Sequence, residues 1–291
     1  MAEIECLYEA KDILGEGPIW HPDEKKLYWC DNLRSCIHRY DPATREVQKW
    51  DMPEEVGSIV FRRGGGIVAG MKSGFCFIDL ETMQIDTIAD PEADIPGNRF
   101  NDGKCDRLGR YWCGTMDAAL ANPTAALYKL DTDLSCHKMD DGFICTNGMA
   151  WSPDNRTMYF ADTRAESVYA YDFDIEAGAV SNRRLFISTA DIPGRVDGAT
   201  VDSEGNYWCA HIHGAAIACY DAFGHLVRSI EMPVRQPTMC TFGGENFDIL
   251  FVTSATKFLK EGEAANQPLA GALFAIHNIG ATGLPEPFFA G

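Results

Sequence analysis

The amino-acid sequence predicts an all-β fold, a six-bladed β-propeller that forms a single domain over residues 1–291. Three observations support this prediction. One short strand pattern recurs along the chain at the spacing of propeller blades. No segment carries the 3.6-residue apolar period of an amphipathic helix. The chain is also interrupted throughout by 27 glycines and 14 prolines, which favour turns between short strands.

The first strand of each repeat follows a turn or polar residue and, in five of the six copies, a glycine. The copies begin at Glu16, Val56, Asp102, Asn147, Asp197 and Gln236. The repeat glycines of the first five copies are separated by 40, 46, 45 and 50 residues. These spacings equal the length of one four-stranded blade, so six repeats account for the whole chain.

The later strands of each repeat also resemble one another. A second strand carries Tyr-Trp-Cys at the same register in three copies, at residues 28–30, 111–113 and 207–209. Two further strands, joined by hairpin turns, are expected in the segments 36–47, 75–85, 126–135, 168–180 and 216–227. The repeated aromatic residues are expected in the cores of the blades, and they include Trp20, Trp29, Trp112, Trp151 and Trp208.

The two ends of the chain are expected to meet. The segment 274–290 lacks a final strand of its own, and the segment 5–10 has no partner within the first repeat. We therefore expect the N-terminal segment to complete the last blade and close the ring. Closure would also remove an exposed sheet edge that invites aggregation.

Composition and charge exclude several classes of partner. The chain has 25 basic and 43 acidic residues, a net charge of −18, so we expect binding to neither nucleic acid nor anionic membranes. The N-terminal residues contain no signal-peptide pattern, and no apolar stretch is long enough for a spanning helix. The 11 cysteines include no Cys-x-x-Cys pair and are an odd number, which favours reduced thiols in the cytoplasm.

The residue before each repeat glycine predicts a ring of polar side chains, because the first strand of every blade lines the central channel. This register holds Glu16, Val56, Asp102, Asn147, Asp197 and Gln236. Taken singly, a polar residue before glycine is ordinary turn sequence. Several carboxylates around one narrow axis, however, repel one another unless a cation or protons compensate. The sequence therefore predicts one divalent cation with an open coordination position.

The donors of this ring are oxygens, which suit Ca²⁺, Mg²⁺, Mn²⁺ or Fe²⁺ better than a structural Zn²⁺. The identity of the ion stays open among these and Zn²⁺. Arg99 and Asn101 alternate along a strand, so both should face the channel mouth and could bind a ligand rich in hydroxyl groups. Equally, Arg99 could simply neutralise Asp102. His211 and His213 also share a strand face, but a pair at a strand end is more typical of packing or of the surface.

Five motifs together resemble the senescence marker protein 30/gluconolactonase family, including luciferin-regenerating-enzyme-like proteins. They are LGEGPIW (14–20), NRFNDGK (98–104), GTM (114–116), TNGMAWSPD (146–154) and VDG with DSEGNYW (196–208). The chain is most similar to bacterial sugar-lactone hydrolases of that family. The resemblance implies a six-bladed propeller, metal ligands at Glu16, Asn147 and Asp197, and substrate contacts from Arg99 and Asn101. Asp102 matches an acidic position beside that pair.

The resemblance further implies metal-dependent hydrolysis of an aldonolactone, such as glucono-, xylono- or arabinolactone, with Asp197 as the base. Animal members carry a substrate-contacting Glu where this chain has Ala119, so the loop 117–126 should form a different lid. Two other functions stay open. The same ligands could serve a calcium-binding regulatory propeller without lactonase activity, or a metal-dependent esterase or organophosphate hydrolase. No GxSxG, HExxH or P-loop motif is present to support a serine hydrolase, zincin or nucleotide-binding alternative.

Overall fold

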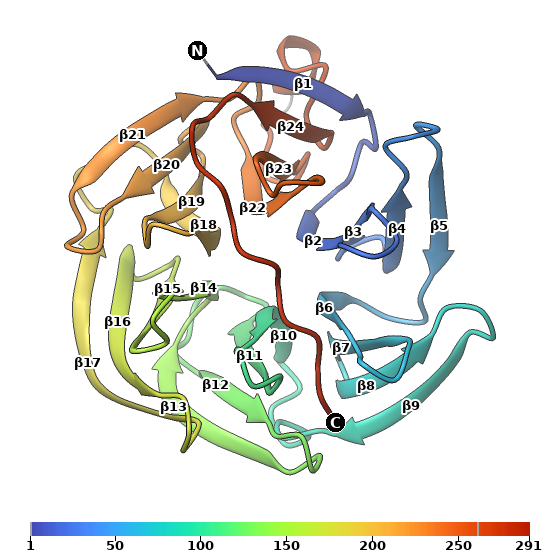
Figure 1. Ribbon diagram of the computed structural model, residues 1–291, viewed down its shortest axis with the longest axis vertical. Helices are drawn as coiled ribbons and strands as arrows, with labels where there is room; N and C mark the ends of the chain where they lie inside the picture. The colour runs from blue at the N-terminus through green and yellow to red at the C-terminus, as the bar shows by residue number, and fades with distance from the viewer. Residues whose placement is uncertain (1, 261) are drawn as a thin grey trace.

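The computed structural model of the protein describes residues 2–260 and 262–291. It consists of six four-stranded antiparallel sheets arranged around a common axis (Figure 1). The prediction of a six-bladed β-propeller is thus confirmed. The described residues include one short 3₁₀ helix, η1(Glu263–Asn266), and no helix that is long and apolar enough to cross a membrane.

Blades 1 to 5 are each formed by four strands that are consecutive in the sequence. Blade 1 contains β2(Gly15–His21), β3(Lys26–Asp31), β4(Cys36–Tyr40) and β5(Val47–Asp51), and blade 2 contains β6(Val56–Phe61), β7(Ile67–Met71), β8(Gly74–Asp79) and β9(Gln84–Ala89). Blade 3 contains β10(Asn98–Cys105), β11(Tyr111–Asp117), β12(Ala125–Leu130) and β13(Cys136–Phe143), and blade 4 contains β14(Thr146–Trp151), β15(Thr157–Asp162), β16(Ser167–Asp174) and β17(Ala179–Ser188). Blade 5 contains β18(Arg195–Val201), β19(Tyr207–Ile212), β20(Ala216–Tyr220) and β21(Leu226–Glu231).

Blade 6 combines strands from both ends of the chain. It contains β22(Pro237–Gly243), β23(Ile249–Ser254), β24(Leu273–His277) and, at its outer edge, β1(Glu3–Tyr8). Strand β1 runs antiparallel to β24, with Glu3 opposite His277 and Cys6 opposite Phe274. The segment 274–290, which was expected to lack a strand, therefore begins within β24. The N-terminal strand β1 supplies the fourth strand of this sheet.

The first strand of every blade lies nearest the axis (Figure 1). These six inner strands are almost entirely buried, as in β10, where all eight residues are buried, whereas the outer strands β5, β9, β13, β17 and β21 are largely exposed. Inner strands pack against neighbouring blades on both faces, while outer strands have water on one side. Side chains on the inner strands therefore lie in a dry, crowded environment.

A β-bulge interrupts the pairing of the first and second strands at the repeat register. In blade 1 the register shifts between Glu16 and Ile19, and in blade 4 it shifts between Asn147 and Ala150. Gly17 and Gly148 follow the register residue with φ of 57° and 58°, a left-handed conformation that glycine adopts without strain. The bulge rotates the strand and so re-aims the side chain that precedes the glycine.

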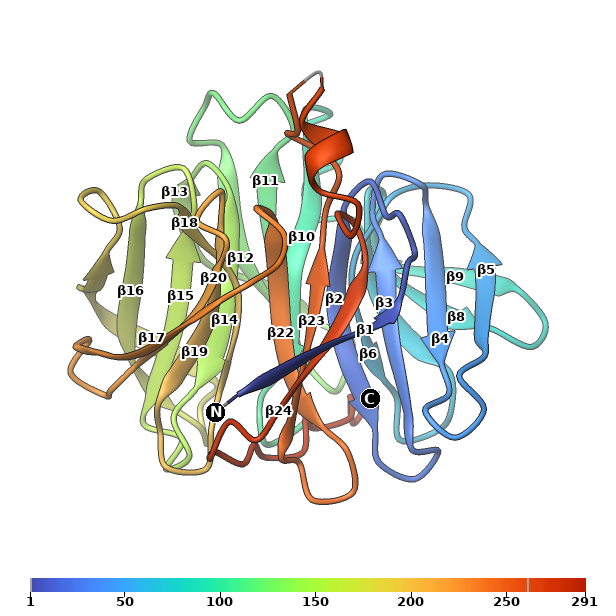
Figure 2. The same cartoon turned by 90° about the horizontal axis from the view of Figure 1, so that it is seen from above.

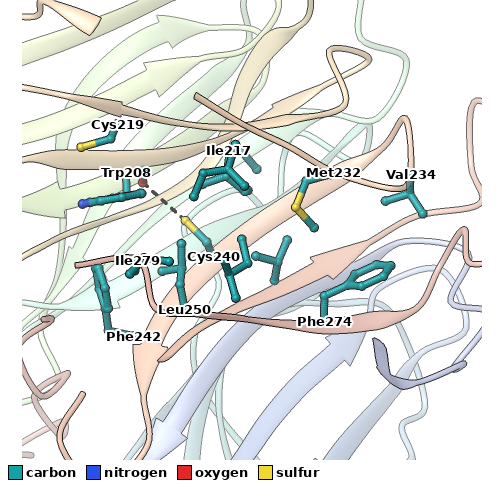
Figure 3. Packing of buried hydrophobic residues seen from close by; sticks show 14 of the residues in the cluster. Trp208, Ile217, Cys219, Met232, Val234, Cys240, Phe242, Leu250, Phe274 and Ile279 are labelled. Atoms are coloured by element: carbon teal, nitrogen blue, oxygen red, sulfur yellow. Dashed lines mark hydrogen bonds between the residues drawn. The ribbon is translucent and has the colours of Figure 1, made fainter. Parts of the chain in front are cut away.

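The blades are joined by apolar clusters, of which the one between blades 5 and 6 is shown in Figure 3. There, Trp208 packs edge-on against Phe242 with ring centroids 6.1 Å apart, and the Cys240 thiol contacts the Trp208 carbonyl oxygen at 3.5 Å. All five repeated tryptophans are buried, as predicted. The Tyr-Trp-Cys tryptophans are also fixed by indole N–H bonds of 2.8 Å to aspartates: Trp29 to Asp12, Trp112 to Asp106 and Trp208 to Asp202.

The C-terminal segment crosses the axis of the propeller on the side opposite to η1 (Figures 1 and 2). Its Glu286 accepts a 2.7 Å hydrogen bond from the buried Lys104 ammonium on β10. Further along, Phe289 is fully buried and forms a bridge with Arg62. This segment covers one end of the inner strands, and η1 lies at the opposite end of the propeller (Figure 2).

Candidate functional site

The six residues at the repeat register all lie on, or directly before, an inner strand, and none is more than 7% exposed. They are Glu16, Val56, Asp102, Asn147, Asp197 and Gln236. Because the inner strands surround one axis, residues far apart in the sequence share one small volume. This ring is the starting point for the candidate site.

Glu16 and Asp197 belong to blades 1 and 5, yet their carboxylates act on each other. Burial raises the pKa of Glu16 well above its ordinary value, and the charges of Asp197 and Asp102 raise it further. Burial likewise raises the pKa of Asp197, with Asp102 adding to the effect and Arg99 opposing it. Repulsion of this kind means that the carboxylates lie within range of one another's charge. Within the described chain, neither carboxylate is paired with a cationic side chain at salt-bridge distance.

Asn147 lies on β14 and its side chain is fixed at both ends of the amide. Its Oδ1 accepts a 2.9 Å hydrogen bond from Nδ2 of Asn101, and its Nδ2 donates at 2.8 Å to Oγ1 of Thr163. The Thr163 hydroxyl donates in turn, at 2.7 Å, to the carbonyl oxygen of Val196, the residue before Asp197. These bonds orient the amide oxygen and connect Asn147 to the blade that carries Asp197. A carbonyl oxygen accepts two bonds, so Oδ1 keeps one lone pair for a ligand.

Arg99 and Asn101 lie side by side on β10, as their alternation along the strand predicts. The Arg99 Nη1 donates to Oδ1 of Asn101 at 3.1 Å and to the Phe100 carbonyl at 2.9 Å, and its Nε lies 3.2 Å from the Glu55 carboxylate. Arg99 is only 5% exposed. The alternative in which Arg99 serves to neutralise Asp102 is not supported, because its ion-pair partner is Glu55.

Asp102 is turned toward the backbone of the next blade. Its Oδ2 accepts a 3.0 Å hydrogen bond from the Met149 N–H, and its Oδ1 has no hydrogen-bond partner among the described residues. Burial raises the pKa of Asp102, opposed by the Met149 N–H and by Lys104. Asp102 therefore fastens the strand that carries Asn147, and its charge contributes to the field at Glu16 and Asp197.

The donors converging here fit a divalent cation that prefers oxygen. Within the described chain, no three side chains of His, Cys, Asp or Glu come together as metal ligands. The candidate set of Glu16, Asn147 and Asp197 instead offers two carboxylates and one amide oxygen. The two carboxylates are buried and repel each other, so bound positive charge would lower their electrostatic cost. Few protein donors would also leave coordination positions for water and substrate.

Sequence reasoning missed several residues beside this set. Glu55, which pairs with Arg99, directly precedes Val56 in a weak repeat copy. Cys145 is buried two residues before Asn147, and its Sγ lies 3.6 Å from Nδ2 of that asparagine. Burial first, and then the charge of Asp197, raise the pKa of the Cys145 thiol. Only the position of Glu55 beside the repeat register could have indicated it in advance.

The loop at residues 117–126 is held by Asp117 at its start. The Asp117 carboxylate accepts backbone hydrogen bonds from Ala119 at 3.0 Å, Ala121 at 3.1 Å and Asn122 at 2.7 Å. The same N–H groups, with that of Asn122 contributing most, lower the pKa of Asp117. The loop is thus locally ordered without any side chain from Ala119 reaching inward.

His211 and His213 do not act as a pair. The buried His211 contacts the Tyr220 hydroxyl at 3.2 Å and the Pro193 carbonyl at 3.4 Å, so it is a packing residue. His213 has a backbone φ of 66° and lies at the turn after β19. The interpretation of this pair as packing and surface residues agrees with these contacts.

Comparison with known proteins gives a consistent result. Residues 14–256 match the family described as SMP-30/Gluconolactonase/LRE-like region. A pentonolactonase of Haloferax volcanii is 38% identical over 282 residues, which cover 94% of this chain and 93% of that protein. A 6-deoxy-6-sulfogluconolactonase of Pseudomonas putida is 34% identical over 289 residues, with 99% of both chains covered. The crystal structure of regucalcin, a calcium-binding protein from Agrobacterium tumefaciens, superposes with a TM-score of 0.93 at 27% identity, covering 98% of this chain and 96% of that one.

Proposed function

The chain belongs to the SMP-30/gluconolactonase/LRE-like family, and on that premise we propose that it hydrolyses a sugar lactone to the corresponding aldonic acid. Candidate substrates are glucono-, xylono- and arabinolactone. The lactonase names of two relatives that align over nearly the whole chain support this reaction class. One structural observation carries the proposal: the amide oxygen of Asn147 is oriented by Asn101, which contacts Arg99, and the buried carboxylates of Glu16 and Asp197 lie within range of each other's charge.

In this proposal Glu16, Asn147 and Asp197 hold the divalent cation. When bound, the cation would polarise the lactone carbonyl and stabilise negative charge on its oxygen. The hydrogen bond from Asn101 keeps the Asn147 oxygen directed toward that position. Because Glu16 and Asp197 are buried, leaving their negative charges without a bound cation is energetically costly.

The reaction adds water to the carbonyl carbon, breaks the bond between that carbon and the ring oxygen, and leaves a proton to be transferred. Asp197 is the proposed base, because no hydrogen bond from the described residues reaches its carboxylate, which therefore has a free oxygen. The proton then passes to the departing ring oxygen, which becomes a hydroxyl group. Arg99 and Asn101 orient the lactone ring through its hydroxyl groups.

The test is a lactone panel with the purified protein, after elemental analysis of its metal content. Proton release is followed with glucono-, xylono- and arabinolactone, before and after chelation, and again after adding back the metal. We expect metal-dependent turnover of at least one lactone, and its loss in Asp197→Asn. Turnover that is indifferent to chelation, or wild-type turnover in Asp197→Asn, would falsify this assignment.

A second candidate is a calcium-binding regulatory role, which the structural similarity to regucalcin favours. It predicts Ca²⁺ binding by calorimetry without hydrolysis of any lactone in the same panel. Aryl esters and phosphotriesters belong in the panel as well, because faster turnover of these compounds would indicate an esterase or organophosphate hydrolase.

A further inference from the structure

One lysine near the candidate site has no ion-pair partner. A bound divalent cation would offset Glu16 and Asp197, and the Arg99 guanidinium is paired with Glu55 at 3.2 Å. The half-buried Lys257 adds a positive charge at the same place. Burial lowers the pKa of its ammonium, Arg99 lowers it further, and Glu55, already paired with Arg99, opposes the shift. Among residues 2–260 and 262–291, Lys257 has no ion pair of its own.

The backbone holds Lys257 next to the strand that carries Glu16. The N–H groups of Thr256 and Lys257 donate to the carbonyl oxygens of Asp12 and Ile13 at 3.0 and 2.9 Å. These two residues lead into β2, where Glu16 is the second residue. The loop that follows β23 is therefore fixed beside the candidate site on the side that the C-terminal segment leaves open.

Gln236, the register residue of blade 6, connects this loop to the turn that contains His213. Its side-chain Oε1 accepts a 2.9 Å bond from the His213 N–H, and its backbone carbonyl accepts a 3.0 Å bond from the Ala255 N–H. The Phe258 ring meets the His213 ring edge-on with centroids 5.4 Å apart, and the Lys257 Nζ lies 5.1 Å from the Phe258 centroid. Lys257, Phe258 and His213 thus form one cluster, which we call the rim cluster.

Two members of the rim cluster have left-handed backbone conformations. His213 and Phe258 adopt φ of 66° and 71°, a region that histidine tolerates but that is strained for the bulky phenylalanine. Phe258 is also 42% exposed, so burial of its ring does not explain its placement. Strain maintained at exposed positions is typical of ligand-binding loops.

Positive charge extends from the rim cluster over blades 4 to 6. Burial lowers the pKa of His213, and the charges of Arg195, Arg235 and Arg164 all lower it further. Arg195 and Arg235 are paired with Glu166 and Glu263. Arg164 and Lys257 have no ion pair among the described residues, and in a chain with a net charge of −18 two such cations favour a negatively charged ligand.

We propose that the rim cluster is an anion subsite, and that the substrate is a lactone with a phosphate, sulfonate or carboxylate group remote from the ring carbonyl. Lys257 contacts the anionic group, and Phe258 and His213 form the wall of the subsite. Arg99 is not assigned to this subsite: its Nε is paired with Glu55 and its Nη1 donates to Phe100 and Asn101, so Nη2 is the group that remains for the hydroxyl groups of the ring. This inference rests on the proposed lactonase function, and it names the substrate class.

The test measures binding of open-chain product acids, which requires no turnover. Calorimetry on the metal-loaded protein compares gluconate with 6-phosphogluconate and with glucarate, which carry a second anionic group at the far end of the chain. We expect at least one of these two acids to bind about 10-fold more tightly than gluconate, and which acid is preferred distinguishes phosphate from carboxylate recognition. Lys257→Met should abolish this preference, because it weakens binding of the doubly anionic acids far more than binding of gluconate, whereas Lys257→Arg should retain most of the preference.

Lys260→Met is the matched control, since it removes one exposed lysine from the same loop and should preserve the preference. Equal binding of all three acids by the wild type, or an undiminished preference in Lys257→Met, would overturn the subsite. Gluconolactone hydrolysis is measured in parallel on the same preparations. Absence of hydrolysis together with a Lys257-dependent preference would refute the lactonase function but leave the anion subsite standing, so the two failures are distinguishable.

Discussion

The Asn101 side-chain amide donates a hydrogen bond of 2.9 Å to Oδ1 of Asn147. This contact joins blades 3 and 4 and links a proposed substrate-binding residue to a proposed metal ligand. Asn101 also donates to the Thr146 carbonyl at 2.8 Å, so it holds both the side chain and the backbone beside it. Metal binding and substrate binding are therefore expected to respond together when Asn101 is changed.

The first prediction concerns that link. Asn101→Ala should weaken metal binding by about 10-fold or more, because partners that orient metal ligands typically contribute 10- to 100-fold in affinity. A competition titration against a fluorescent chelator measures this directly. Asn182→Ala, at an exposed position on β17, is the control and should bind metal as the wild type does. Unchanged affinity in Asn101→Ala would mean that Asn147 needs no support from its neighbour.

The second prediction concerns Glu16. Replacing this buried carboxylate with glutamine should lower metal-dependent turnover by about 10²-fold or more, since a charged ligand is lost. In the metal-free protein the same change should maintain or raise the melting temperature, because it removes the repulsion between Glu16 and Asp197. Thermal scans with and without metal test both statements. A metal-free variant that is markedly less stable than the wild type would contradict the electrostatic argument.

The third prediction is a loss of stability at alkaline pH that depends on His38. The buried His38 lies 3.5 Å from the Asp12 carboxylate, and its pKa is raised to about 9 by Asp12 and Cys36, which outweigh burial. A raised pKa means that the folded state binds the proton more tightly. The contribution is complete below about pH 6.5 and disappears as the pH rises through 9, with a total on the order of 3 kcal/mol.

Urea unfolding at pH 6.5, 8 and 9.5 provides the measurement for His38. The wild type should lose stability across this range, and His38→Gln should lose clearly less. His225→Gln is a suitable control, because His225 is exposed and its partner Asp221 is on the surface. Parallel pH profiles for the wild type and His38→Gln would rule out the His38–Asp12 pair as the source.

The fourth prediction concerns β1. Deleting residues 1–10 removes the outer strand of blade 6 and leaves the backbone of β24 unpaired along that edge. The melting temperature should fall sharply, and the protein should aggregate more readily because a bare edge pairs with other chains. Deleting residues 1 and 2 alone, ahead of the strand, should have little effect. If the protein lacking residues 1–10 melted at the same temperature as the full-length chain, the stability of blade 6 would not depend on β1.

Much of the fold could be predicted from the sequence because the repeats indicate both the number of blades and the strands in each blade. The register of Glu16, Asn147 and Asp197 recurs with the blades, so the repeat pattern by itself predicts that these residues surround one axis. Strand alternation predicts that the side chains of Arg99 and Asn101 point to the same side of β10. The 3.1 Å hydrogen bond from Arg99 Nη1 to Asn101 Oδ1 agrees with this prediction.

Contacts that depend on irregular segments could not be predicted in this way. Glu55 pairs with Arg99 from a connection between blades, and Lys257 lies in a loop without a counterpart in other repeats. The orientation of Asp102 toward Met149 depends on the bulge in the neighbouring blade, because the bulge decides where that N–H points. Periodicity carries no information about such relationships between loops.

The position of β1 in blade 6 also affects how the chain can acquire its structure during translation. Strand β1 leaves the ribosome before the strands of the six blades that follow it, but its partner β24 begins at Leu273. At 5 to 20 residues per second, synthesis of the intervening chain takes roughly 13 to 50 seconds. Until then the first strand has no partner, and the blades already made form an open arc. Closure of the ring must therefore wait until β24 has been made, which makes the nascent chain dependent on protection of both of its free edges.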